Sequence, residues 1–254
     1  PQSRDSAAGL FNSVLAWLQA ATGRIHLPLA CQETAAVWAA VPACIVLGAL
    51  LAALSIFFCE LLHIASKLYK KYLPNPYLRI MAGGVLILAL TKLLGTTDYN
   101  GAGAAVIEAA IDGKALPYAF VLKMLFTALT LGAGFKGGEI VPIFFTGATF
   151  GCVAAPLLGL PPQLGAALGM VALFCGCTNS PLASVCLAIE VFGGRCVPLF
   201  ALACAVSYML SSYFSLYREQ HFMHSKLRIV GVQRIHGIWT ESDTAHSDAH
   251  TEGK

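Results

Sequence analysis

The residues best suited to chemistry lie between Gly132 and Gly151, in the sequence GAGFKGGEIVPIFFTGATFG. Glycines, Lys136, Glu139 and Pro142 separate two apolar runs there. Glycine lets the backbone turn and approach a ligand closely, and proline is tolerated in the first turn of a helix because the N–H it lacks would be unpaired there. A helix that begins near Glu139 would therefore present free N–H groups and the positive end of its dipole. This arrangement predicts an anion-binding site.

Composition indicates a membrane protein. Of the 254 residues, 57% are hydrophobic and 11% are charged, and the mean hydropathy is +0.71. A soluble domain has about a quarter charged residues, so this chain is expected in a lipid bilayer, and we assign it to the cell (inner) membrane. The net charge of +3 is small and spread along loops, which argues against a nucleic-acid partner.

The nine cysteines lie almost all within apolar runs, and their spacing matches neither a zinc site nor a disulfide framework. Cys175 and Cys177 lack a matching second pair of ligands. Buried thiols are therefore expected, and the sequence predicts no metal and no cofactor.

The chain divides into three parts. Residues 1–34 form a leader with the helical spacing of an interfacial helix, residues 35–220 form the transmembrane part, and residues 221–254 form a polar tail that is expected to be partly disordered. The expected helices are all apolar, which predicts an all-α polytopic membrane protein; they cover 35–64, 78–94, 117–131, 141–158, 164–175, 182–192 and 197–209. Several are interrupted by glycine or proline, as in transport folds built from inverted repeats with broken and re-entrant helices.

Lys123 is a lone lysine within the apolar helix expected over 117–131. An ionisable residue in a membrane helix can mark an ion path. It can equally pair with a nearby carboxylate or carbonyl group, and we favour the pairing.

Three blocks of sequence together resemble the CLC family of anion channels and transporters. GFKGGEIVPIFFTGATFG resembles the family's helix-N segment, and GCTNSPLASVCLAIEVFG resembles the following block, in which a proline begins a helix. VPLFALACAVSYMLSSYFSLYREQ resembles the last membrane segments, where the pore tyrosine falls on Tyr217. The order and spacing of the blocks agree with the family. The resemblance covers about 35–220 and implies the second of the family's two inverted repeats.

The resemblance implies anion transport and assigns residues to it. Gly138, Glu139, Ile140, Val141 and Tyr217 are the residues expected at the anion. The backbone N–H groups of Ile140 and Val141 and the hydroxyl of Tyr217 would be the donors.

The sequence KGGE, Lys136 to Glu139, looks like the fluoride/proton antiporter branch of the family. That branch often has a threonine just before the proline, where this chain has Val141. Fluoride export coupled to protons is therefore the expected activity, with chloride transport, by a channel or an antiporter, as the alternative.

No block resembles the family's first repeat, which carries the gating glutamate. The expected partners are thus fluoride or chloride, protons, the bilayer and a chain that carries the first half. The complete unit is expected to form a homodimer. A truncated, non-transporting membrane protein is the second alternative.

Glu139 needs a neutralising partner because a carboxylate beside an anion is repelled by it. We expect it to be protonated or to be bonded to Lys123 or Lys136, which would make these three residues coupling or charge partners. A capping role, in which the carboxylate accepts from the free N–H groups at the start of the helix, is the structural alternative.

A different class of function is suggested by Gly132, Gly134 and Gly137, which match the dinucleotide-binding pattern G-x-G-x-x-G. The pattern requires a preceding strand and an acidic residue about 20 positions later. An apolar helix precedes it here, and Pro156 and Leu157 stand at the acidic position. A membrane oxidoreductase is rejected, and we expect that the protein is not an enzyme.

Overall fold

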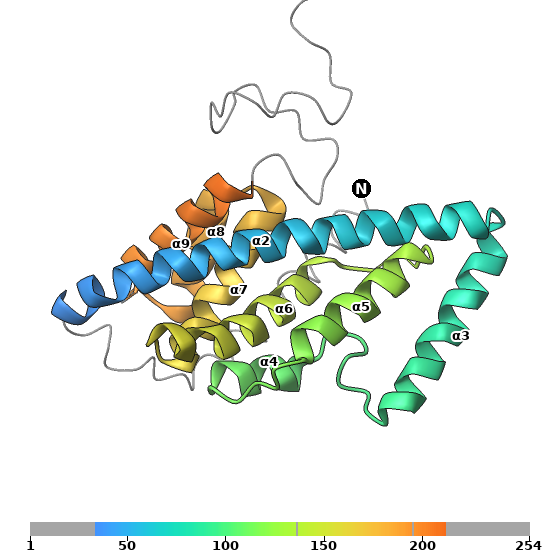
Figure 1. Ribbon diagram of the computed structural model, residues 1–254, viewed down its shortest axis with the longest axis horizontal. Helices are drawn as coiled ribbons and strands as arrows, with labels where there is room; N and C mark the ends of the chain where they lie inside the picture. Colours follow the sequence, from blue (N-terminus) through green and yellow to red (C-terminus); the bar gives the residue numbers. More distant parts are fainter. Residues whose placement is uncertain (1–33, 136, 195, 212–254) are drawn as a thin grey trace, which may run out of the picture. The chain divides into compact units, whose positions relative to one another are not determined.

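A computed structural model describes residues 34–135, 137–194 and 196–211, and all structural statements below concern these residues. This part of the chain is helical and contains no strand (Figure 1). The helices, in chain order, are α2 (Thr34–Tyr72), α3 (Pro76–Leu94), α4 (Ala104–Ile111), α5 (Ala119–Gly132), α6 (Ile140–Ala154), the 3-10 helix η2 (Ala155–Leu158), α7 (Pro162–Thr178), α8 (Pro181–Phe192) and α9 (Val197–Leu210).

Three helices are long and apolar enough to cross a membrane. The candidate spans are Trp38–Tyr72, Pro76–Leu94 and Ile140–Leu158. The expected fold class, all-α and polytopic, is thereby confirmed for the described residues. The other apolar helices have 10–17 residues, so they are shorter than a full crossing.

Helix α2 is the longest element and contacts α5, α6, α7 and α9 (Figure 1). Its 39 residues correspond to about 58 Å of helix, roughly twice the hydrocarbon thickness of a bilayer. A helix of this length must tilt or extend into the headgroup region. Lys70 and Lys71 lie in its last turn, where their positive charges interact favourably with the negative end of the helix dipole.

Helices α6 and α7 form the closest pair in the fold, and glycine makes this approach possible. Gly147 and Gly151 on α6 face Gly165 and Gly169 on α7, four residues apart on each helix. A Cβ atom at any of the four would fall within 3.0 Å of the facing helix. Such small-residue pairs let membrane helices associate through dispersion contacts, which replace the hydrophobic driving force that lipid cannot supply.

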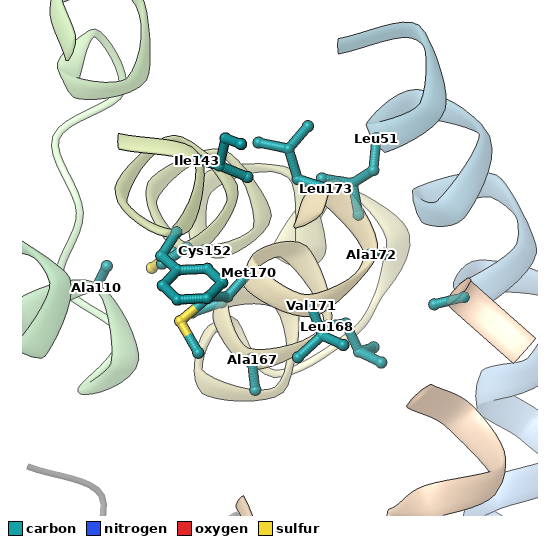
Figure 2. Close-up of a cluster of buried hydrophobic side chains, with 14 of the residues drawn as sticks. Leu51, Ala110, Ile143, Cys152, Ala167, Leu168, Met170, Val171, Ala172 and Leu173 are labelled. Carbon is teal, nitrogen blue, oxygen red and sulfur yellow. The ribbon is translucent and has the colours of Figure 1, made fainter. Parts of the chain in front are cut away.

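The side chains around this glycine contact fill the centre of the fold. Figure 2 shows Ile143 and Cys152 of α6 in one cluster with Met170 and Leu173 of α7 and Leu51 of α2, and all five are at most 4% exposed. The packing of α6 against α7 therefore fixes the position of the start of α6.

Helix α7 is longer than the sequence suggested. A break was expected at Cys175, but the helix continues to Thr178 and ends where Asn179 adopts the left-handed conformation, with φ of 56°. Cysteine and glycine within an apolar helix do not stop it, whereas asparagine can adopt the left-handed geometry that ends a helix. Pro181 then begins α8, as expected.

Helix α3 stands apart from the others, and only Gly83 on it is buried (Figure 1). Its N-terminus is capped by Asn75, whose side-chain oxygen accepts a hydrogen bond from the N–H of Tyr77. Gly83 fits against Ala133, just beyond the end of α5. The large apolar side chains of α3 that are exposed are Tyr77, Leu78, Ile80, Met81, Val85, Leu86, Leu88, Leu93 and Leu94.

The glycine contact can be tested by substituting Gly151 with leucine. The added side chain has no space against Gly165, so the two helices must separate, and overpacking of this kind costs about 1–3 kcal/mol or more. We expect the variant to have a lower melting temperature than the unmodified protein in detergent. The melting temperature is measured by size-exclusion chromatography after heating. Gly194, which has open space around it, provides the matched control Gly194→Leu. Equal melting of both variants and the unmodified protein would show that the close approach is not needed.

Candidate anion site

The linker between α5 and α6 leaves the helix by a tight turn. The N–H of Ala133 donates to the carbonyl of Leu129 at 3.1 Å, and the N–H of Gly134 donates to Leu131 at 3.0 Å. Gly134 has φ of +97°, a conformation that other residues rarely adopt. The turn therefore satisfies the last carbonyls of α5 and redirects the chain towards the start of α6.

Helix α6 begins at Ile140, one residue from the position expected from the sequence. Pro142 occupies its first turn, and the first N–H that bonds along the helix is that of Ile143, which donates to the carbonyl of Glu139 at 3.3 Å. The N–H groups of Ile140 and Val141 have no acceptor within the described part of the chain. These two donors and the positive end of the helix dipole are the groups that can bind an anion at this site.

The approach to these donors is open. Gly137 and Gly138 are exposed, and a Cβ atom on Gly138 would meet nothing within 4 Å. A small anion can therefore reach the backbone of this segment without displacing a side chain of the described residues. The backbone is suited to bind it because N–H dipoles at a helix start substitute for the hydration shell of an anion.

Glu139 is the residue that precedes α6, and its side chain is half-buried. It makes no capping hydrogen bond, so the capping role considered above is wrong for this structure. Burial raises the pKa of its carboxyl group, because removal from water disfavours the charged form.

Lys123 is buried, with 2% of its surface exposed, and its ammonium group binds carbonyl groups. Nζ donates to the carbonyl oxygens of Gly101 at 2.6 Å and Tyr99 at 3.2 Å, and it lies 4.9 Å from the ring centroid of Phe145. The expected pairing with a carbonyl group is thus observed. The two hydrogen bonds of Lys123 thus go to backbone carbonyl groups rather than to Glu139.

The carbonyl groups that bind Lys123 belong to the loop between α3 and α4. Lys123 therefore connects this loop to α5 by hydrogen bonds, and its cation–π contact with Phe145 connects both to α6. Desolvated cation–π contacts of this kind contribute about 2 kcal/mol. Lys136 and Tyr217, which the sequence also assigns to the site, lie outside the described residues.

Arg79 on α3 is a residue near the site that the sequence did not single out. Its Nε donates to the carbonyl of Ala133 at 3.1 Å, at the first residue of the linker. A lone arginine near the start of an apolar helix was the available signal, but the contact spans 54 positions in the sequence, so no local pattern could reveal its partner.

Many transporter folds are polytopic, helical and contain interrupted membrane helices, as this chain does. The sequence model of the voltage-gated chloride channel family matches residues 6–212. The chain therefore belongs to this family, the CLC family, whose members transport anions.

Relatives of the chain include both fluoride and chloride proteins. The chain is 38% identical over 177 residues to a chloride/fluoride channel protein of Pseudomonas syringae, covering 67% of this chain and 39% of the relative. It is 29% identical over 160 residues to the H⁺/Cl⁻ exchange transporter ClcA of Vibrio cholerae, covering 58% of this chain and 34% of the relative.

A solved structure supports the same fold. The crystal structure of a CLC-type fluoride/proton antiporter superimposes with a TM-score of 0.68 at 34% identity, covering 70% of this chain and 45% of the antiporter. The chain thus spans less than half the length of each of these three proteins.

Proposed function

We propose that this chain is the second half of an anion transporter that exports fluoride in exchange for protons. The observation that carries the proposal is the pair of N–H groups at Ile140 and Val141, which have no acceptor among the described residues and lie next to a half-buried carboxyl group at Glu139. Fluoride concentrates its charge in a small volume and therefore gains more from oriented N–H donors than chloride does. Similarity to the fluoride/proton antiporter supports the same choice of ion.

Glu139 supplies the link to protons in this proposal. A bound anion repels the charged carboxylate, so anion binding and protonation of Glu139 favour each other. Burial already moves the pKa of this group upward, which brings proton uptake closer to physiological pH. Exchange then requires that the proton reach this carboxyl group from the side to which fluoride leaves and depart to the side from which fluoride enters.

The site requires a second wall, which we assign to a first-half chain or segment. The relatives contain more than twice the length that this chain matches. Helix α3 and the outward side of α2 expose apolar residues such as Phe57, Met81 and Leu88. These surfaces suit the helices that make up the remaining length of the relatives, and they suit lipid around them. We further propose a homodimer of the complete unit in the cell (inner) membrane.

Chloride transport is the second candidate, and two observations favour it. The Vibrio cholerae chloride/proton exchanger is a relative, and Val141 offers no hydroxyl group where the fluoride branch often has threonine. Without that hydroxyl group, the donor set for a strongly hydrated ion is smaller.

Flux measurements decide between the two ions. The chain is reconstituted in liposomes with the N-terminal remainder of the Pseudomonas syringae relative, and efflux of fluoride and of chloride is followed with ion-selective electrodes. We expect fluoride efflux, accompanied by proton uptake, only when both parts are present. Liposomes with either part alone serve as controls. Faster efflux of chloride than of fluoride would identify chloride as the transported ion. The absence of efflux of either ion would contradict the proposal that this chain is part of an anion transporter.

The role of Glu139 is tested by the variant Glu139→Gln, which mimics the protonated side chain. Because the charged form opposes the anion, the unmodified protein should bind fluoride more tightly as the pH falls through the raised pKa of Glu139. The variant should keep the low-pH affinity at all pH values and lose proton coupling. The half-saturating fluoride concentration and the proton flux are measured between about pH 4 and pH 8. This range begins near the usual glutamate pKa and extends upward, the direction in which burial moves the pKa of Glu139.

The matched control is Glu108→Gln, which removes a charge from an exposed position on α4. It should leave the pH dependence and the coupling unchanged. Retention of both properties in Glu139→Gln would remove Glu139 from the mechanism.

A further inference from the structure

Arg79 holds the start of the linker through a hydrogen bond to a backbone carbonyl group. Its Nε donates to the carbonyl of Ala133, and a Cβ atom on Gly134 would lie 3.0 Å from one of its terminal nitrogens. The guanidinium group therefore lies directly against the backbone where the linker begins. Among the residues that the structure describes, no Asp or Glu forms an ion pair with it.

A cation that binds only carbonyl dipoles keeps its unit charge. The negative end of the α5 dipole, equivalent to about half an elementary charge, offsets Arg79 in part. A carboxylate partner would have cancelled the charge fully. Because Arg79 is partly buried, its field is also less screened than that of a residue in open water.

The distance from Arg79 to the donors of α6 is limited by the linker. Val141 is seven residues beyond Gly134, so the chain can separate the guanidinium group from the two donors by no more than about 30 Å. At that separation and an effective dielectric constant of about 20, one unit charge changes the affinity for a monovalent anion about 2.5-fold. A shorter separation makes the effect larger.

We propose that Arg79 is a positioning residue for the transported anion, whose positive charge raises the affinity of the site at the α6 N-terminus. This inference depends on the proposed anion transport. It differs from a purely structural role for Arg79 as a cap of α5, because a cap requires only an N–H donor, whereas the proposed role requires a charge.

The variants Arg79→Gln and Arg79→Lys separate charge from hydrogen bonding. Glutamine can still donate to the Ala133 carbonyl but is neutral, and lysine keeps the charge. In the reconstituted protein, Arg79→Gln should raise the half-saturating fluoride concentration about 2.5-fold or more and leave the maximal rate unchanged. Arg79→Lys should restore the affinity to within about 1.5-fold.

A second variant leaves Arg79 in place, so that misfolding cannot account for the result. Asn75→Asp keeps the cap of α3, because aspartate is as good an N-cap as asparagine, and it adds a negative charge one helical turn from Arg79. It should raise the half-saturating concentration in the same direction as Arg79→Gln. Lys92→Gln removes an exposed charge about 20 Å further along α3, which water screens more strongly, and should have a smaller effect than Arg79→Gln.

The outcomes distinguish this inference from the transport proposal. Affinities of Arg79→Gln and Asn75→Asp within about 1.5-fold of the unmodified protein overturn the role of Arg79 while transport stands. Loss of affinity in Arg79→Lys equal to that in Arg79→Gln also overturns it, because charge alone would then not suffice. No flux in the unmodified protein overturns both proposals.

Discussion

The proposed site depends on two backbone N–H groups at the start of α6 that have no acceptor within the described part of the chain. In a low-dielectric environment an unsatisfied N–H group costs several kcal/mol, so a membrane helix that begins in this way needs a polar partner. Pro142 removes one donor from the first turn, and the N–H groups of Ile140 and Val141 remain. Glu139 stands next to them without accepting from them, which leaves both donors for a small anion.

Rigid packing behind this helix start fixes where the donors point. The glycines of α6 and α7 bring the two backbones into contact, and α2 covers the pair from one side (Figures 1 and 2). Lys123 ties the loop after α3 to α5 and contacts Phe145 on α6. A site made of backbone dipoles must be preorganised, because its donors cannot change rotamer to follow the ligand. Close glycine packing provides this, and substitution of a single glycine would disturb it.

The sequence predicted the parts of the site that local rules govern. Glycines followed by a first-turn proline predicted the helix start near Glu139, and a lone lysine in an apolar helix predicted that Lys123 pairs with a carboxylate or carbonyl group. Three features of the structure could not be predicted from the sequence because they depend on the three-dimensional fold. The end of α7 depends on the left-handed conformation of Asn179, and the absence of a cap by Glu139 depends on where its side chain is held. The contact of Arg79 with the linker joins residues 54 positions apart, which no periodicity can indicate.

Binding of an anion by Ile140 and Val141 can be observed at the two amides themselves. Selective ¹⁵N labelling of isoleucine and valine in the reconstituted transporter, followed by titration with fluoride, reports hydrogen bonding at each N–H group. Saturating downfield proton shifts are predicted at Ile140 and Val141, with no shift at Ile111, which is buried at the end of α4. Unchanged resonances of Ile140 and Val141 at fluoride concentrations that saturate transport would contradict an anion site at the start of α6.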